Sequence, residues 1–210
     1  MVVGIDPGAS AAVALVDRAG AGRPLLLGLW SVYGDWAPWL ARADLALMAI
    51  QERPDGGSPV VYCEAPTGGG KTRGAKFTPD SWLGLGKRAG ALRALAWARG
   101  LEVWHDVDQE DWAVALRLPN RKFPAEQRRG DPADGWHRVL EAGQLVEGAR
   151  ENLKEMPHES DAAVERIVCA AEAILIACAA QLAGEQLVAR TAKRASHSRA
   201  HQTAHHRRSA

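Results

Sequence analysis

The fold class is decided near the start of the chain, by the stretch Val2-Val3-Gly4-Ile5-Asp6-Pro7-Gly8. Its apolar residues predict a short buried strand, which Pro7 and Gly8 stop. The strand ends on the carboxylate of Asp6, and a buried carboxylate is costly unless a cation neutralises it. Asp6 is therefore a candidate metal ligand. The alternative is that it serves only as a turn residue before Pro7.

Outward from this strand, apolar periodicity and turn residues divide the rest of the chain into short elements. Further strands are predicted at 11–17, 25–33, 60–64 and 101–107, and helices at about 35–53, 80–100, 108–116, 135–155 and from 160 onward. The first three strands follow one another through short turns, which predicts an antiparallel meander. The strand at 60–64 is apolar on both faces, which is typical of a central strand. The order predicts an α/β fold, a mixed sheet with helices on both faces.

The end of the chain differs in composition from the rest. From Arg190 to Ala210 there are six Lys or Arg, four His and no acid, whereas the preceding residues hold 20 basic and 25 acidic side chains. This segment has almost nothing apolar larger than alanine, so it cannot bury enough surface to offset its ordering entropy. We predict a domain at 1–189 and a flexible basic tail at 190–210, disordered or a frayed helix. The tail is either an electrostatic arm for a polyanion or a solvated terminus without a role.

Three cysteines and eight tryptophans lie mostly among apolar residues. Cys63, Cys169 and Cys178 show no metal-binding spacing and are predicted to be reduced core thiols, as in cytoplasmic proteins. The tryptophans are predicted to lie in the core or in a dimer interface. No apolar run reaches the roughly 18 residues of a membrane span. We therefore expect a cytoplasmic protein without a membrane partner.

Three further side chains have positions that suit metal binding. Glu64 ends the strand at 60–64, and His158 and Asp161 open the last helix, three residues apart, so both can point to one side of it. Carboxylates with one imidazole suit Mg²⁺ or Mn²⁺, and two such ions can activate water and steady the leaving oxygen of a phosphodiester. The alternatives are a salt bridge for Glu64, an interaction with the helix dipole for Asp161 and a position next to the helix cap for His158.

Taken in order, three motifs of the chain resemble those of the RuvC-like Holliday junction resolvases, which belong to the ribonuclease H-like nuclease superfamily. They are Gly4-Ile5-Asp6-Pro7-Gly8, Glu64 at a strand end, and His158-Glu159-Ser160-Asp161-Ala162-Ala163. The resemblance covers about residues 1–180, and the polar segment 117–134 and the basic tail depart from the family's pattern.

The resemblance implies a ribonuclease H-like fold with a five-stranded sheet whose first three strands are antiparallel. It implies that Asp6, Glu64 and Asp161 hold two Mg²⁺ or Mn²⁺ ions, with His158 as a ligand or a proton-transfer group. It also implies a homodimer that cuts two strands of a four-way DNA junction symmetrically.

Basic residues predict the surface that meets DNA. The glycine-rich loop after Glu64 carries Lys71, Arg73 and Lys76, which are predicted to neutralise phosphates near the metals. Phe77 is predicted either to insert at an open base step or to anchor the loop in the core. The basic track is extended by three pairs, unless these are only solvated: Lys87 and Arg88, Arg121 and Lys122, and Arg128 and Arg129.

Three other functions stay open. The stretch from Ala65 to Thr72 fits a relaxed phosphate loop around Lys71 and would make an ATPase or kinase, although Ala65 replaces the first glycine and Pro79 opposes the helix that should follow. An actin-like sugar kinase shares the Asp-Pro-Gly opening, but it needs two domains, and 210 residues are too few. The third is a DNA-binding module with an inactive site. Metal-dependent cleavage and ATP turnover separate these possibilities.

Overall fold

Five strands form one sheet, in the order β3-β2-β1-β4-β5. The structure is a computed structural model, and it describes residues 1–8, 10–18, 22–53, 58–65, 79–118 and 136–208. The strands are β1 (Val2–Asp6), β2 (Ala11–Arg18), β3 (Pro24–Val32), β4 (Val60–Glu64) and β5 (Trp104–Val107). β2 is antiparallel to both β1 and β3, whereas β4 is parallel to both β1 and β5. The predicted meander and mixed sheet are confirmed, and the fifth strand is shorter than predicted.

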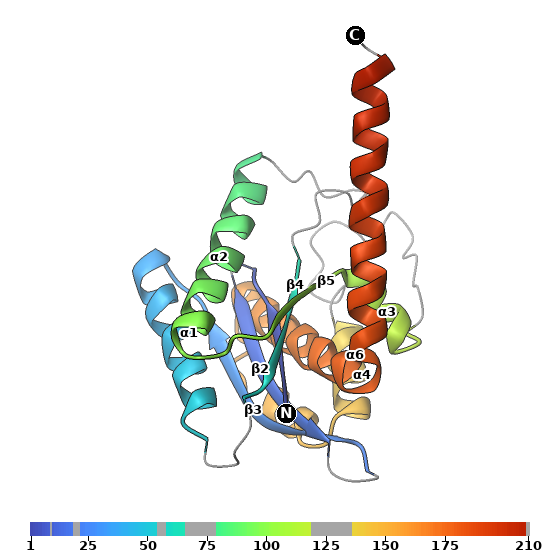
Figure 1. Cartoon of the computed structure of the whole chain (residues 1–210). Coiled ribbons are helices and arrows are strands. Elements are labelled where there is room, and N and C mark those ends of the chain that lie inside the picture. Colours follow the sequence, from blue (N-terminus) through green and yellow to red (C-terminus); the bar gives the residue numbers. More distant parts are fainter. Residues whose placement is uncertain (9, 19–21, 54–57, 66–78, 119–135, 209–210) are drawn as a thin grey trace.

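Helices cover both faces of the sheet and make a three-layered α/β fold (Figure 1). One face packs on α1 (Trp36–Gln51) and α2 (Pro79–Ala98). The other face packs on four helices: α3 (Gln109–Ala115), α4 (Trp136–Leu145), α5 (Ala149–Lys154) and α6 (Asp161–Arg208). Each face has its own cluster of buried apolar side chains, because alternate residues of the inner strands point to opposite sides.

The first half of α6 lies directly on β1. A side chain on Gly4 would collide with the backbone of Ala173 and Ala177, so glycine is needed for this close approach. The predicted apolar face of the helix is confirmed as buried: Ala163, Ile167, Ala170, Ala171, Ile174 and Leu175. By length and composition the stretch Asp161–Lys193 is apolar enough to cross a membrane, but 61% of its most apolar window is buried inside the fold, as in a core helix.

One predicted helix was wrong in extent, whereas the predicted start of α1 at Asp35 is confirmed. The single helix predicted at 135–155 is two helices, α4 and α5, separated at Gly148, whose φ of +79° is left-handed. The break serves the sheet, because the Glu147 carbonyl accepts a hydrogen bond from the Leu26 amide at 2.9 Å and the Glu147 amide donates to the Pro24 carbonyl at 2.8 Å. Asp35 does occupy the N-cap position of α1, but its side chain makes no capping hydrogen bond.

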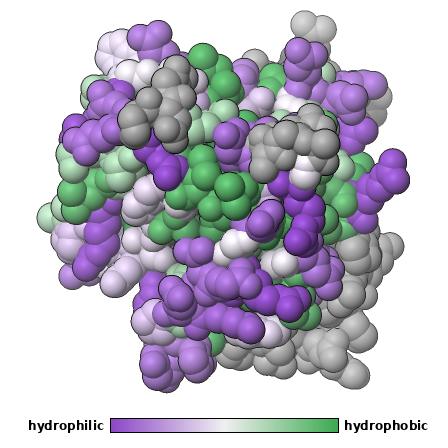
Figure 2. Space-filling view, turned by 90° about the horizontal axis from the view of Figure 1, so that it is seen from below, coloured by the Kyte–Doolittle hydropathy of each residue, from purple (hydrophilic) through white to green (hydrophobic). Residues whose placement is uncertain are grey.

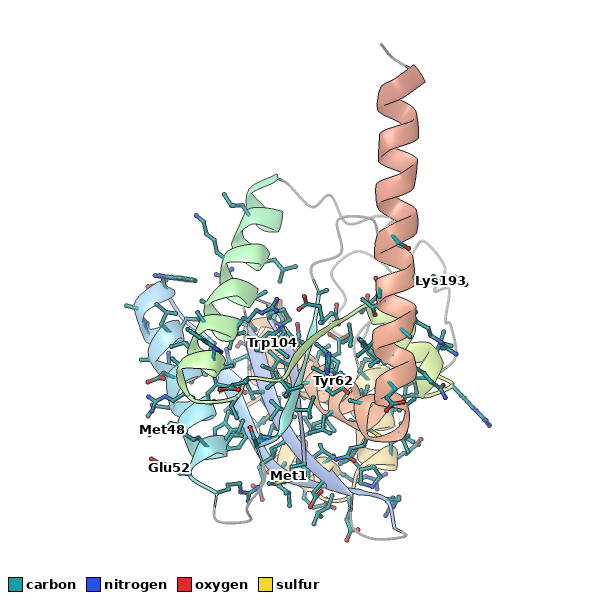
Figure 3. The ribbon with its side chains drawn as sticks, in the orientation of Figure 1. Met1, Met48, Glu52, Tyr62, Trp104 and Lys193 are labelled. Atoms are coloured by element: carbon teal, nitrogen blue, oxygen red, sulfur yellow. The ribbon has the colours of Figure 1, made fainter. Side chains whose placement is uncertain are left out.

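The basic end of the chain is helical up to Arg208, as a continuation of α6. The helix bends at Ala183, whose φ of −150° and ψ of 33° are not helical, and its second half projects away from the sheet (Figure 1). Figure 3 shows Lys193 on this projecting half, away from Tyr62 and Trp104 on the strands. The predicted boundary at residue 189 therefore falls within a helix. The role of 190–210 as an electrostatic arm stays a prediction.

The prediction that most tryptophans lie in the core is confirmed only in part, because Trp30 and Trp104 are partly buried against a core cluster while others are exposed. Among the tryptophan side chains that the structure describes, only Trp39 and Trp112 are buried, and Trp97 is 72% exposed. Trp97 directly follows Ala96, which faces the core, and one step along a helix turns a side chain by about 100° toward solvent. Figure 2 shows hydrophobic residues exposed between hydrophilic ones on one face of the molecule.

Candidate metal site

Asp6 and Glu64 end two neighbouring parallel strands at the same edge of the sheet. In the register of β1 and β4, Ile5 pairs with Cys63, so the next residue of each strand is one of the two acids. Their charges interact, because Asp6 is one of the groups that raise the pKa of Glu64. The structure therefore brings together the first two predicted site residues, as strand pairing required.

Asp6 lies between the turn that follows β1 and the buried face of α6. Its Oδ1 accepts a hydrogen bond from the Gly8 amide at 3.3 Å, and its carboxylate also accepts one from the Cys169 thiol of α6. Burial raises its pKa from 3.8 to about 6, despite the opposing effect of these hydrogen bonds. Asp6 is thus a turn residue, and burial also destabilises its charged form. A nearby cation would stabilise that form.

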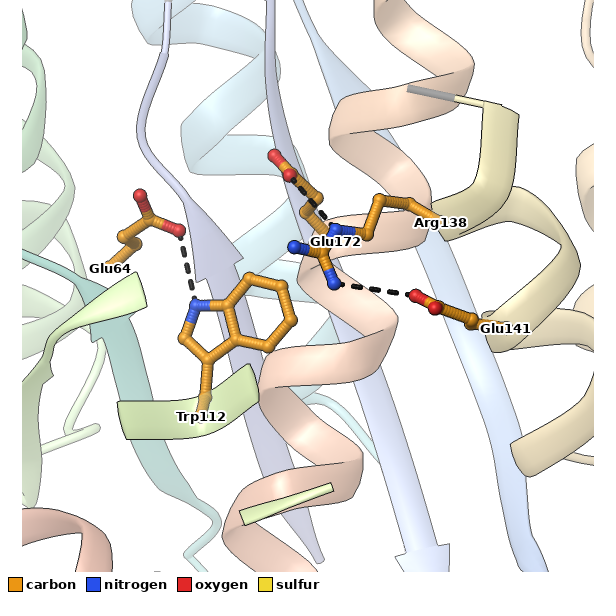
Figure 4. Close-up of polar contacts among 5 residues, drawn as sticks. All are labelled: Glu64, Trp112, Arg138, Glu141 and Glu172. Carbon is orange, nitrogen blue, oxygen red and sulfur yellow. Dashed lines mark hydrogen bonds and ion pairs between the residues drawn. The ribbon is translucent and has the colours of Figure 1, made fainter. Parts of the chain in front are cut away.

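Glu64 is held by the indole of Trp112, from α3. Trp112 is fully buried, and its Nε1 donates to Glu64 Oε2 at 3.2 Å (Figure 4). Burial raises the pKa of Glu64 well above its usual range, and the negative charges of Glu172 and Asp6 raise it further. The predicted alternative, a salt bridge from Glu64 to a lysine, is not present among the residues that the structure describes.

A third acid, Glu172 of α6, joins these two. Burial raises its pKa to about 8, and the charge of Asp6 raises it as well, whereas Arg138 and a hydrogen bond from Gln109 lower it. Arg138 Nε lies 3.8 Å from Glu172 Oε1, and Arg138 Nη1 lies 3.3 Å from Glu141 Oε2 (Figure 4). One arginine thus contacts two carboxylates, Glu141 and Glu172.

Arg138 also links the contacts of Glu172 to those of Glu64. Its guanidinium lies 4.9 Å from the centre of the Trp112 ring, so the residue that binds Glu172 also packs on the residue that binds Glu64. The contacts therefore run from α4 through α3 to the end of β4, and from α4 to the buried middle of α6. Such outer partners fix the orientation of the side chains that do chemistry.

His158 and Asp161 are placed differently from the three acids. Both are exposed at the start of α6, where the Ser160 hydroxyl caps the helix by accepting from the Ala163 amide at 3.2 Å. The α6 residue that contacts Asp6 is Cys169, eight positions after Asp161, which corresponds to about 12 Å along the axis. The structure does not bring His158 or Asp161 to Asp6, and their roles as ligands stay predictions.

Cys169 and Glu172 are neighbours of Asp6 that the sequence analysis did not single out. They repeat the spacing of His158 and Asp161, three positions apart, but further along the helix. A signal was available in the sequence. Glu172 is the one charged residue in the apolar stretch from Ile167 to Ala180, where an unpaired charge is costly.

Most residues predicted to bind DNA lie outside the described residues: Lys71, Arg73, Lys76, Phe77, Arg121, Lys122, Arg128 and Arg129. Of the remaining pair, on α2, Lys87 is exposed and Arg88 is partly buried. Their contacts with DNA stay predictions.

The donor atoms fit a hard divalent cation, since the three acids offer only carboxylate oxygens. Their arrangement is not yet a coordination shell, because no three Asp, Glu, His or Cys side chains among the described residues are grouped to hold an ion. Glu64 turns one oxygen to Trp112, and Glu172 turns toward Arg138.

Comparison with known proteins agrees with this architecture. No protein-family model matches the chain, and no curated protein matches it. Two solved structures of RuvC from Thermus thermophilus are similar to it. The structure with a Holliday junction substrate has 17% sequence identity and a TM-score of 0.55, and covers 88% of this chain and 95% of that one. The other has 19% identity and a TM-score of 0.51, and covers 89% and 96%.

The class that these observations define is an α/β protein with a ribonuclease H-like fold. More particularly, the chain has a RuvC-like fold over most of its length, as the sequence motifs predicted.

Proposed function

We propose that this protein is a divalent-metal-dependent endonuclease that cuts four-way DNA junctions by hydrolysing a phosphodiester in each of two strands. The observation that carries the proposal is that Asp6 and Glu64 end neighbouring strands of a RuvC-like sheet, where both interact electrostatically with Glu172 of α6. Each acid has a raised pKa, and burial is the largest cause in every case. Perturbed acids of this kind gather where a protein needs them for chemistry.

In this proposal the three carboxylates hold Mg²⁺ or Mn²⁺, with two ions per site. Bound ions would activate water and stabilise the charge on the phosphodiester oxygens. The chain's own residues supply the orientation: Trp112 turns Glu64, Cys169 donates to Asp6, and Arg138 holds Glu172. His158 and Asp161 are the competing candidates for the ligands from α6.

A homodimer is part of the proposal, because two cuts across a two-fold symmetric junction need two active sites. The exposed apolar side chains of α2 support a contact with a second copy on this helix. Leu83 is 57% exposed and Trp97 is 72% exposed. The molar mass by light scattering, measured for the wild type and for Trp97→Glu, tests this part. A wild-type monomer would contradict it.

The phosphate-loop alternative is not favoured by the similarity of fold. It is tested beside the main proposal by measuring ATP hydrolysis by the same preparation.

The experiment uses a labelled four-way junction and a matched linear duplex, each with Mg²⁺, Mn²⁺ or EDTA, for the wild type and for Asp6→Asn. We expect paired nicks in the junction with either metal, none with EDTA, and none in the variant. Equal cutting of both substrates would reject junction selectivity. No cutting by folded wild-type protein would reject the nuclease.

A further inference from the structure

Tyr33, Arg42 and Arg166 form a cluster that the proposed chemistry does not use. The guanidinium of Arg42 lies 4.3 Å from the centre of the Tyr33 ring, and that of Arg166 lies 4.7 Å from it. Arg42 belongs to α1 and Arg166 to α6, so the cluster joins helices from the two faces of the sheet. Arg42 Nη1 also donates to the Tyr33 carbonyl oxygen at 2.7 Å, which fixes this arginine in place.

Strand pairing places this cluster at the same edge of the sheet as the acids. β3 is parallel to β1, because both are antiparallel to β2. Asp6 pairs with Ala12, and Ala12 pairs with Ser31, so Ser31 stands in the same row as Asp6 about 10 Å away. Tyr33 follows two residues later, just beyond the end of β3.

The helix gives the same placement independently. Arg166 precedes Cys169 by three positions, which is less than one turn of α6. Cys169 is the residue that donates to the Asp6 carboxylate. Arg166 is therefore a near neighbour of the acid site along α6, as Tyr33 is across the sheet.

The two arginines carry charge that no described acid neutralises. Arg99 and Arg138 each have a carboxylate oxygen within 4 Å, at 2.6 Å and 3.3 Å. Neither Arg42 nor Arg166 forms an ion pair with any residue that the structure describes. Two guanidinium groups held against one ring repel each other, and an anion bound between them would remove that repulsion.

The chemistry of the cluster favours phosphate as this anion. A guanidinium presents paired N–H donors that match the oxygens of a phosphate. The Tyr33 ring is occupied by the arginines, so it serves to hold two cations and is not free to stack on a base. Tyr33 is 38% exposed, which leaves the cluster open to a ligand from solvent.

We infer that Tyr33, Arg42 and Arg166 bind a backbone phosphate of the DNA strand that enters the acid site, beside the phosphodiester to be cut. This inference rests on the proposed nuclease function. It assigns to the cluster a task separate from metal binding: neutralising a phosphate and so fixing where the strand lies relative to Asp6 and Glu64.

The test measures binding of a labelled four-way junction in EDTA over a series of salt concentrations. Loss of one phosphate contact lowers the slope of log affinity against log salt by about one unit. We expect Arg42→Gln/Arg166→Gln to lower the slope by about that amount or more. Arg42→Lys/Arg166→Lys keeps both charges and should keep the wild-type slope. Arg99→Gln removes an arginine already paired with Asp44 and should also keep it.

A wild-type slope in the double glutamine variant would overturn the inference, and so would an equal loss in Arg99→Gln. The proposed nuclease would stand in either case, because the wild type would still bind and cut the junction. Failure of the wild type to bind the junction at low salt would instead reject the proposed function, and the inference with it.

Discussion

The start of α6 and its buried middle carry the same pattern in different surroundings. At the start, His158 and Asp161 are exposed, and neither side chain makes a hydrogen bond or ion pair with another described residue. In the middle, Cys169 donates to Asp6, and Glu172 interacts with both Asp6 and Arg138. The two places share a spacing of three residues, but only the buried middle of α6, which packs closely on β1, has contacts with Asp6 in this structure.

The largest expected effect is on the rate of junction cleavage, and it distinguishes the start of α6 from its buried middle. Glu172→Gln should lower the rate of junction cleavage by about 100-fold or more, since even the outer partners of metal ligands cost about 10–100-fold when replaced. Asp161→Asn should leave the rate within about threefold, because an exposed side chain without partners contributes little. Single-turnover cleavage measures both. A larger loss of rate in Asp161→Asn than in Glu172→Gln would instead place the site at the start of α6.

The second prediction concerns the residue that orients Glu64. Trp112→Phe removes the indole donor but keeps an aromatic ring, and should lower kcat by about 10–100-fold without changing KM for the junction. Trp39→Phe is the matched control, because Trp39 is equally buried and its Nε1 has no partner among the described residues. A similar kcat in the two variants would show that Trp112 only fills the core.

The third prediction tests the close packing of α6 on β1. Gly4→Ala forces a methyl group against the backbone of Ala173 and Ala177, and should lower the free energy of unfolding by about 1–3 kcal/mol. Gly86→Ala, in α2, meets nothing within 4 Å and should instead raise it by up to about 1 kcal/mol. Urea unfolding measures both values. Equal stability of the two variants would contradict the close approach of β1 and α6.

The smallest effect is on stability against pH. The pKa of Asp6 rises from 3.8 to about 6 on folding, and that of Glu172 from 4.5 to about 8, so the folded protein binds more protons than the unfolded chain in this range. The stability that protonation gives is complete below about pH 4 and is lost as the pH rises to about 8. We therefore expect Tm in EDTA to fall from pH 5 to pH 8.

Mg²⁺ should reverse this trend, because it binds the deprotonated carboxylates and stabilises the folded state more at pH 8 than at pH 5. Thermal unfolding at both pH values, with Mg²⁺ or EDTA, measures the effect. In Glu172→Gln the fall in EDTA should be smaller. An equal gain in Tm from Mg²⁺ at pH 5 and at pH 8 would contradict the idea that the ion displaces protons from the carboxylates.

Much of the fold could be predicted from sequence because it depends on local patterns. Apolar runs gave the strands, and parallel pairing of β1 with β4 then had to bring Asp6 and Glu64 together. The break at Gly148 could not be predicted, because it depends on hydrogen bonds from Glu147 to the distant strand β3. The exposure of Trp97 was missed for a related reason: composition does not say which side of a helix has a neighbour.

The interaction of Glu172 with Asp6 and Glu64 could not be predicted from sequence, because it depends on how α6 packs on the sheet. His158 and Asp161 follow Pro157 at a visible helix start, which favoured them over Cys169 and Glu172. The close approach of Gly4 to Ala173 and Ala177 fixes which turns of α6 lie beside β1. Glu172 belongs to one of these turns, directly before Ala173.

The most direct test of the buried site is a titration with Mn²⁺ at pH 8, in which the electron paramagnetic resonance of the free ion reports binding to wild type, Glu172→Gln and Asp161→Asn. Asp6, Glu64 and Glu172 as ligands predict that Asp161→Asn binds Mn²⁺ like the wild type. They also predict that Glu172→Gln binds about 10-fold or more weakly. Wild-type affinity in Glu172→Gln, with binding lost in Asp161→Asn, would contradict the site and place it at the start of α6.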